Sequence, residues 1–194
     1  MKHKVLILAG LLCLWSAASV FAAKVKPVAV ASGNISVLKS PSKVFLEVDY
    51  SSAKVGEQAL DEYLKGRGDD FVRDWPEDIK KTSASFAFSF NRENRKGAQI
   101  PFPLMEDAGD AAYKLVIRIE SIDMGNGSRF FNPFAPPKAG GIIISGAVDI
   151  VDTKTNEVVC TLKVNKVKGR GDVSESKRLS WMFGELARYI CKLL

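Results

Sequence analysis

The side chains best suited to chemistry in this sequence are carboxylates, and they occur in three adjacent pairs: Asp61-Glu62, Asp69-Asp70 and Glu106-Asp107. Glycoside hydrolysis needs two carboxyl groups held roughly 5–10 Å apart on either side of the bond that is cleaved. Acids that are neighbours in sequence cannot face each other across one substrate. The pairs therefore favour solvated surface charge, and a carboxylate-dependent hydrolase with an unmarked site is the alternative function.

Imidazole chemistry is excluded from the mature chain that we expect. The only histidine, His3, lies in an N-terminal segment with the features of a secretory signal. Ser-His-Asp sites, Cys-His sites and histidine-containing zinc sites are then ruled out. The glycines at 125–127 and 140–141 lack the strand–glycine–helix context of a phosphate-binding loop. The sequence predicts no catalytic residues, no cofactor and no metal ligands.

Two cysteines remain after removal of that segment, Cys160 in an expected strand and Cys191 in an expected C-terminal helix. An even number of cysteines in an oxidising compartment is typical of a disulfide. Two separately buried thiols are the other interpretation, because free cysteine is among the residues most often buried. Both interpretations stay open at this point.

The sharpest functional feature is an apolar loop over residues 125–141, which lies between two expected strands. Its prolines and glycines rule out regular structure, and a connection of this length in a compact domain is usually functional or disordered. Its phenylalanines can pack on their own sheet, dock on a partner, or enter a bilayer with the two cations at the lipid head groups. The residues expected to make the contact are Arg129, Phe130, Phe131, Pro133, Phe134 and Lys138.

The first 22 residues read as a signal peptide, with two lysines, an apolar run and a tail of small residues. We expect cleavage after Ala22 and export to the periplasm or cell envelope. Cys13 follows a leucine where a lipoprotein signal needs a small residue, so it is assigned to the signal. Removing Lys2 and Lys4 lowers the net charge from +6 to +4. This mild, dispersed excess predicts no nucleic-acid partner and is compatible with peripheral membrane contact.

The elements that carry these residues begin with a flexible lead segment over 23–42, followed by a single domain over 43–194. Alternation of apolar and polar residues predicts a strand over 43–50. A short helix is expected over 57–65. A second helix is expected to begin near Pro76, which suits a first helical position. A short edge strand is expected over 98–105, because its prolines cannot donate to a ladder.

The second half predicts three antiparallel strands and a long helix. The strands span about 112–123, 141–152 and 157–167, with Val158, Cys160, Leu162 and Val164 facing inward. Asp172 and Glu175 form a capping box for a helix that runs to the C-terminus. The fold class that follows is α+β, a mainly antiparallel sheet of four to five strands with two or three helices on one face.

This pattern resembles a group of small exported bacterial domains of unknown function related to envelope lipoproteins. The resemblance rests on "AYKLVIRIESIDMGNG", "GGIIISGAVDIVDTKTNEVVCTLKV" and the terminal amphipathic helix. Penicillin-binding-protein activator lipoproteins and the periplasmic part of the curli secretion channel have a similar architecture. The resemblance implies a binding or assembly module. This sequence departs from the group in lacking a lipobox cysteine.

The sequence therefore predicts an exported, non-catalytic envelope protein that acts through protein–protein contact or assembly, with the 125–141 loop as its contact surface. The partner is an envelope protein or a second copy of the chain. A subunit of a membrane-associated assembly is the further alternative.

Overall fold

A computed structural model describes residues 25–39, 43–94, 110–125, 140–172 and 174–194. Within these ranges one sheet contains seven strands. The strands are β1 (Val28–Gly33), β2 (Val44–Asp49), β3 (Lys54–Val55), β4 (Gln58–Ala59), β5 (Tyr113–Asp123), β6 (Ile143–Asp152) and β7 (Val158–Lys168). The helices are the 3-10 helix η1 (Ile35–Lys39) and the α-helices α1 (Leu60–Arg67), α2 (Asp69–Asn94) and α4 (Glu175–Cys191).

The sheet is mixed and mainly antiparallel, which confirms the α+β class. Strands β1, β7, β6 and β5 lie side by side as antiparallel neighbours. On the far side of β5, both β2 and β3 pair with it in parallel, β2 along its first half and β3 near its end. The strand number exceeds the four to five expected, because β1 and the short pair β3–β4 were not recognisable as strands.

Strand β1 corrects the expectation of a loosely attached lead segment. It pairs antiparallel with β7, from Val28 opposite Val164 to Gly33 opposite Cys160. Val28 is buried under the helices, and η1 buries Ile35 and Leu38 at the end of the sheet. A short Val-Ala alternation is a weak strand signal by itself. The available edge of β7 and three buried apolar side chains favour the strand here.

Helix α2 begins seven residues before the expected position. It starts at Asp69, directly after Gly68, so Pro76 lies inside the helix and not at its first position. Proline inside a helix removes one backbone hydrogen bond and is unfavourable by itself. Trp75 and Ile79, which flank this turn, are buried in the core. Tertiary packing therefore outweighs the local effect of the proline.

Helix α4 is capped differently from the expectation. Its N-cap is Ser174, whose Oγ accepts a hydrogen bond from the backbone N–H of Lys177 at 3.4 Å. The carboxylate of Asp172 instead accepts from the backbone N–H of Ser174 at 3.0 Å. The predicted N-cap, Asp172, is therefore wrong by two residues. Ser174 takes the capping role that was expected of Asp172.

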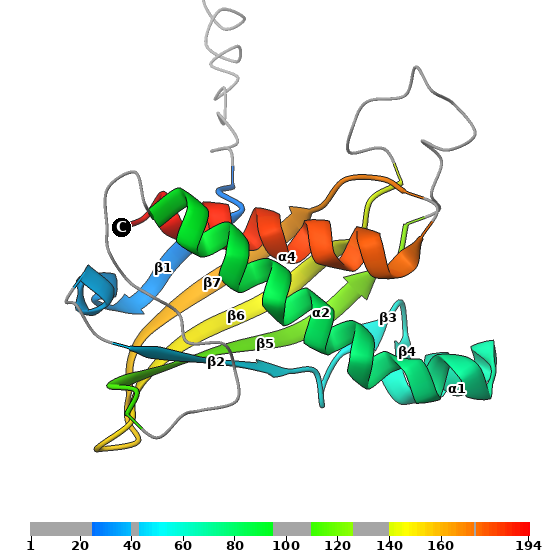
Figure 1. Cartoon of the computed structure of the whole chain (residues 1–194), viewed down its shortest axis with the longest axis horizontal. Coiled ribbons are helices and arrows are strands. Elements are labelled where there is room, and N and C mark those ends of the chain that lie inside the picture. The colour runs from blue at the N-terminus through cyan, green and yellow to red at the C-terminus, as the bar shows by residue number, and fades with distance from the viewer. Residues whose placement is uncertain (1–24, 40–42, 95–109, 126–139, 173) are drawn as a thin grey trace, which may run out of the picture.

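Helices α2 and α4 cover one face of the sheet and form the second layer of the fold (Figure 1). They run in the same direction, because Ser85 Oγ donates to the Ser180 carbonyl at 2.9 Å while Ser89, one turn later, lies against Gly184. A Cβ on Gly184 would lie 2.9 Å from Ser89 Oγ, so the glycine permits this close approach. Both helices consequently begin at the same end of the molecule.

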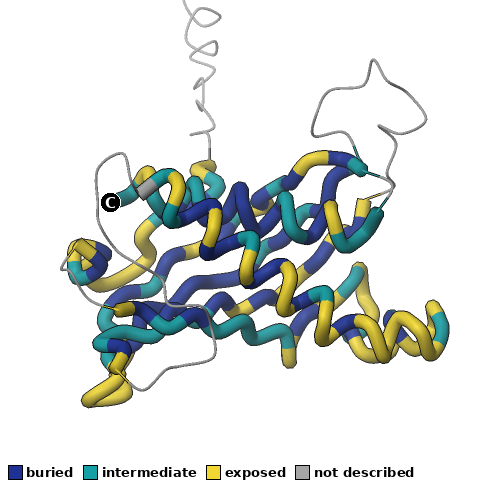
Figure 2. Tube along the Cα trace, in the orientation of Figure 1, coloured by how far each residue is buried: buried dark blue, intermediate teal, exposed yellow. Residues whose placement is uncertain are grey.

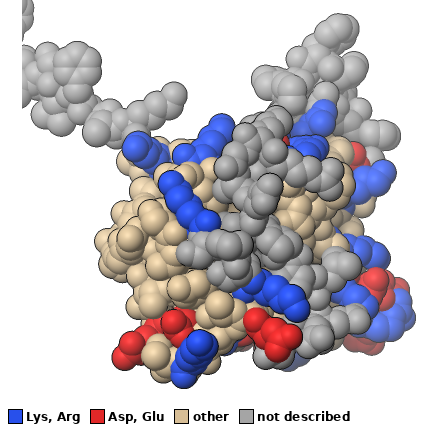
Figure 3. Space-filling view, turned by 60° about the vertical axis from the view of Figure 1, so that its left-hand side comes forward, with Lys and Arg blue, Asp and Glu red and all other residues tan. Residues whose placement is uncertain are grey.

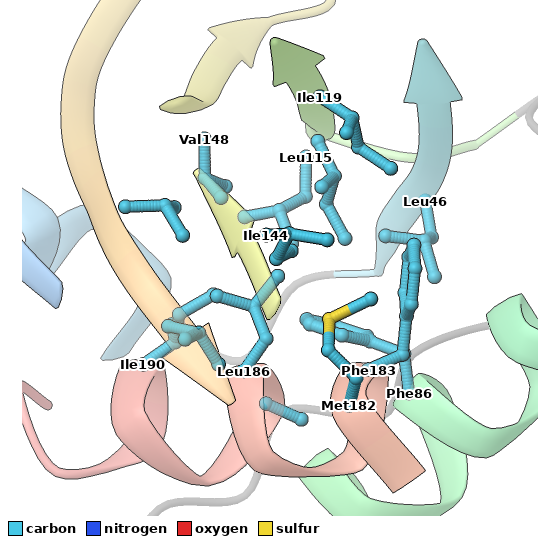
Figure 4. Packing of buried hydrophobic residues seen from close by; sticks show 14 of the residues in the cluster. Leu46, Phe86, Leu115, Ile119, Ile144, Val148, Met182, Phe183, Leu186 and Ile190 are labelled. Carbon is cyan, nitrogen blue, oxygen red and sulfur yellow. The ribbon is translucent and has the colours of Figure 1, made fainter. Parts of the chain in front are cut away.

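The core fills the space between the two layers. Figure 4 shows side chains of both helices pointing toward the strands, and the burial of the strands beneath the helices is visible in Figure 2. The apolar stripe expected for the terminal helix is buried throughout α4. The fully buried large side chains are Phe86, Phe90, Phe183, Leu38, Leu46, Leu115, Ile117, Ile142, Ile144, Ile150 and Leu162.

The central hairpins follow the sequence pattern closely. The inner positions of β5 and β7 are buried as expected, with two exceptions at the strand starts: Tyr113 is half-buried and Val158 is 54% exposed. A register irregularity between Ile150 and Val151 shifts the pairing there, which takes Val158 off the inner face. The turn after β6 places Asn156 at a φ of 57°, a conformation that asparagine tolerates.

The expected edge strand over 98–105 lies outside the described residues. Among the helices that the structure describes, none is long and apolar enough to cross a membrane.

Candidate functional site

The six residues expected to make the contact, Arg129 to Lys138, lie outside the described residues. The structure does describe the two stems from which their segment leaves the body. Strand β5 ends at Asp123 and continues to Met124 and Gly125, and the chain re-enters at Gly140 just before β6. The geometry of these stems is the described part of the predicted site.

A buried arginine joins the two stems. Arg178 Nη1, from the first turns of α4, donates to the Met124 carbonyl at 2.7 Å and to the Gly140 carbonyl at 3.2 Å. Only 8% of the Arg178 side chain is exposed. The two N–H groups of this one nitrogen can serve two acceptors at once, and a buried charge needs such partners. We call this arrangement, of Arg178 with the Met124 and Gly140 carbonyls, the Arg178 clamp.

Glycines bring the stems into direct backbone contact beside the clamp. A Cβ on Gly125 would lie 2.4 Å from the Gly140 carbonyl oxygen, and one on Gly141 would lie 2.2 Å from the Gly169 carbonyl oxygen. Gly169 in turn lies against the backbone of Met182 in α4. Any larger residue at these positions would push the stems apart. The base of the loop is therefore packed against α4 without intervening side chains.

An ion-pair chain extends from the clamp toward α1. Glu175 Oε2 lies 3.9 Å from Arg178 Nη2 and 3.2 Å from Arg67 Nη1. Arg67 also packs over the ring of Phe71 at 4.1 Å from its centroid. Partly exposed pairs of this kind contribute little stability by themselves. They do show that the loop stems, the start of α4 and the junction of α1 and α2 lie at one end of the molecule.

A shallow apolar groove lies on this end, between α1, the start of α2 and the segment after β2. Its open volume is about 360 Å³. The apolar walls are formed by Tyr50, Leu60, Leu64, Val72, Trp75 and Pro76. The Tyr50 and Trp75 rings meet edge to face with centroids 6.0 Å apart. Ser51, Asp61 and Lys65 complete the lining.

The groove belongs to an acidic part of a basic chain. Residues 54–78, which we call the acidic arm, contain eight acidic and four basic side chains, a net charge of −4 in a chain whose total is +6. Figure 2 shows α1 and the start of α2 as largely exposed. On the face drawn in Figure 3, lysines and arginines are dispersed among uncharged side chains. The charge of the molecule is therefore unevenly divided between the arm and the rest.

The expected carboxylate pairs are surface groups where the structure describes them. Asp61 pairs with Lys65 at 3.5 Å and Asp70 with Arg73 at 2.8 Å, all with mostly exposed side chains. Glu106-Asp107 lies outside the described residues. No group of three or more histidine, cysteine, aspartate or glutamate side chains suited to a metal ion occurs in the described part of the chain.

The candidate disulfide between Cys160 and Cys191 is not present, and both cysteines are free thiols. Cys160 is buried in β7, whereas Cys191 is half-buried at the end of α4, where its Sγ contacts the Phe90 carbonyl at 3.7 Å. Burial, with the nearby charge of Glu93 as a smaller cause, raises the pKa of Cys191 to about 12. Burial likewise raises the pKa of Cys160. Both thiols are therefore poor nucleophiles near neutral pH.

The face of the sheet opposite the helices carries one buried carboxylate. Asp149 in β6 accepts hydrogen bonds from Arg118 Nε of β5 at 2.8 Å and from Thr161 Oγ1 of β7 at 2.8 Å. The three side chains lie across three neighbouring strands. Both oxygens of the carboxylate have partners, so this cluster is explained as a structural link between strands.

Sequence reasoning missed the clamp and the groove. Arg178 borders the apolar stripe of α4, and a charged residue at that position is the one signal that could have drawn attention to it. The groove had no signal, because its walls come from three separate elements. The loop stems were located correctly through their glycines.

The fold defines the chain as an α+β domain whose mixed sheet is covered on one face by two parallel helices. Two solved structures with a similar fold are the PelC dodecamer from Paraburkholderia phytofirmans and a single-substitution variant of the same dodecamer. The first is 12% identical with a TM-score of 0.42, over 84% of this chain and 97% of that one. The second is 13% identical with a TM-score of 0.41, over 85% and 98%. No protein-family model and no curated protein sequence matches the chain.

Proposed function

We propose that this chain is an exported, non-catalytic protein of the bacterial envelope that acts through protein–protein contact. The contact surface in this proposal is the segment 125–141, with Arg129, Phe130, Phe131, Pro133, Phe134 and Lys138 as its contacting residues. The partner is a second copy of the chain or another envelope protein. Export rests on the signal-like N-terminal segment, cleaved near Ala22.

The single observation that carries the proposal is the Arg178 clamp. A buried guanidinium binds the carbonyls of Met124, just before the segment, and Gly140, near its end, at 2.7 and 3.2 Å. Fixing both ends of a segment reduces the conformational freedom that it must lose on binding, and this favours affinity.

The composition of the segment supports the same conclusion. Burying a phenylalanine is worth about 1.5–3 kcal/mol, which favours a buried position for each of the three. Beside the stems, Ile142, Val167 and Met182 are fully buried in the core. In this proposal the three phenylalanines gain their burial on the surface of the partner.

The test is replacement of Phe130, Phe131 and Phe134 by serine, compared with wild type by crosslinking and pull-down from intact cells. A matched control replaces three exposed apolar residues of the body, Val30, Phe88 and Val158, by serine. The proposal expects the loop variant to keep its circular dichroism and melting temperature and to lose its crosslinked partner. The control variant keeps both.

Two results would overturn the proposal. If the loop variant unfolds, the phenylalanines belong to the core of their own domain. If it folds and retains its partner, the contact lies elsewhere. Flotation with anionic vesicles is measured alongside, because a loss of vesicle binding without loss of a protein partner would assign the segment to a membrane surface instead.

A further inference from the structure

We propose that the apolar groove on the acidic arm receives the segment 126–139 of a second copy of this chain. This inference rests on the proposed function and names both the partner and the surface on it. Its occupant is the segment that carries three phenylalanines and two cations, Arg129 and Lys138, and no acid. The contact is thus between two different surfaces of the same molecule.

The apolar match is the first argument. The groove offers about 360 Å³ between the Tyr50–Trp75 ring pair and the apolar side chains of α1 and α2. Aromatic side chains bind well in such lined depressions, and edge-to-face partners add to the burial term. Val72 on its wall is 42% exposed and Phe71 next to it is 37% exposed. These are among the few large apolar side chains that the described part of the chain leaves exposed.

Charge is the second argument. The arm around the groove has a net charge of −4, and its acids are almost all exposed. On the groove itself Asp61 and Lys65 form an ion pair at 3.5 Å, so the excess negative charge comes from the acids around the groove. The segment carries only positive charge. Opposite surface potentials raise the rate of encounter and fix the orientation of the partners, and the attraction weakens as salt screens it. Two copies therefore attract each other through the arm of one and the segment of the other.

The arrangement of the stems is the third argument. The clamp holds Met124 and Gly140 together, so the segment leaves the body with both of its ends fixed at one place. The ion pairs Arg178–Glu175 and Glu175–Arg67 place this point at the same end of the molecule as the groove. Two copies that meet at this end can each offer a segment to the other's groove.

The first test is the concentration dependence of the mass of the mature chain by sedimentation velocity. Val72→Arg puts a cation into the groove at an exposed helical position, so the fold is retained. It is expected to weaken self-association at least about tenfold. Phe88→Arg, at an exposed position farther along the same helix, is the matched control and leaves self-association unchanged. An equal effect of both variants, or of neither, overturns the proposal.

A charge exchange provides a second test that does not depend on the apolar wall. Asp61→Arg and Arg129→Asp each place like charges opposite each other in the proposed contact, and each is expected to weaken association. The double variant restores the opposite pairing and recovers association toward that of the wild type. Additive losses in the double variant contradict the proposal. Association of the wild type falls as sodium chloride rises from about 50 to about 500 mM.

Photo-crosslinking distinguishes a second copy from the same copy. Benzoylphenylalanine at position 72 is expected to crosslink to residues 126–139, and mixing heavy- and light-isotope chains gives mixed-isotope crosslinked peptides. Crosslinks within one chain only, independent of dilution, overturn the inference. If the triple serine variant loses an envelope partner while Val72→Arg and self-association show no effect, the groove inference fails and the proposed function stands. If the triple variant loses nothing, the proposed function itself fails.

Discussion

Arg178 on the last helix donates to the carbonyl of Met124 at the end of β5, 54 residues earlier in the chain, at 2.7 Å. The same nitrogen reaches the carbonyl of Gly140, which lies just before the next strand, β6. One side chain of the helical layer thereby fixes both ends of the loop that interrupts the sheet layer. A change that displaces α4 should therefore also destabilise the base of the loop.

Arg178→Leu is expected to destabilise the protein by about 2–4 kcal/mol, because it leaves two carbonyls near the core without their donor and each such loss costs about 1–3 kcal/mol. Urea unfolding of wild type and variant measures the difference. Limited proteolysis should also cut the 126–139 segment faster in the variant. Lys177→Leu, at the adjacent exposed position, is the control and should stay within about 0.5 kcal/mol of wild type. Equal stability of the Arg178→Leu variant and wild type would mean that the clamp is not formed in solution.

Two glycine substitutions are expected to have opposite effects. Gly141→Ala places a Cβ 2.2 Å from the Gly169 carbonyl oxygen, and relieving this overlap should cost about 1–3 kcal/mol. Gly66→Ala lies in α1 with no atom within 4 Å of the new Cβ, and should stabilise by up to about 1 kcal/mol through helix propensity. Thermal melts of both variants check the pair. Stabilisation by Gly141→Ala would show that the stems are farther apart in solution than in the structure.

The elements that the sequence predicted correctly depend on local periodicity. The alternation in β5 and β7 and the apolar stripe of α4 are decided by each segment's own pattern, and all three are present. The loop stems were likewise found through their glycines. Element boundaries were less predictable: α2 starts before Pro76 because the burial of Trp75 outweighs the proline, and the α4 cap is Ser174 because serine and aspartate are nearly equal as caps.

The features that escaped prediction depend on contacts between distant segments. Strand β1 forms because β7 offers it an edge, whereas the short Val-Ala alternation within residues 28–33 is only a weak signal. The groove combines Tyr50 with Leu64 and Trp75 from separate elements. The choice between a Cys160–Cys191 disulfide and two free thiols, left open by the sequence, depends on spatial proximity, which the spacing in sequence does not determine.

The Asp149 cluster predicts an interaction energy that a double-mutant cycle can measure. Arg118 and Thr161 both donate to the Asp149 carboxylate at 2.8 Å. Thr161→Val removes one donor and should cost about 1 kcal/mol, while Asp149→Ala should cost about 1–3 kcal/mol. The double variant should cost less than the sum of the two by about 0.5–1.5 kcal/mol. Full additivity in urea unfolding would indicate that Thr161 and Asp149 do not interact.

The absence of a disulfide predicts that both cysteines can be alkylated once the chain is unfolded. Unfolded in denaturant without reductant and treated with iodoacetamide, the mature chain should take up two carbamidomethyl groups, one on Cys160 and one on Cys191, because no disulfide joins them. In the native state both should react slowly at about pH 8, since burial raises the pKa of each. Intact-mass spectrometry reads both experiments. An unreactive pair in denaturant would establish the disulfide.

Cys191 also predicts a pH dependence of stability. Its pKa is about 12 in the folded protein, mainly because of burial, and about 9 for an ordinary thiol. Between these values the unfolded chain has released its proton and the folded chain has not, so the unfolded state binds fewer protons and stability falls as pH rises. Below about pH 9 both states are protonated and this contribution is constant. The unfolding free energy of the wild type minus that of Cys191→Ala should therefore be constant from about pH 7 to 8.5. From about pH 9 to 11 it should decrease, because only the wild type loses stability through this thiol. A difference that stays constant over that second interval would show that the Cys191 thiol is solvated as readily as in the unfolded chain.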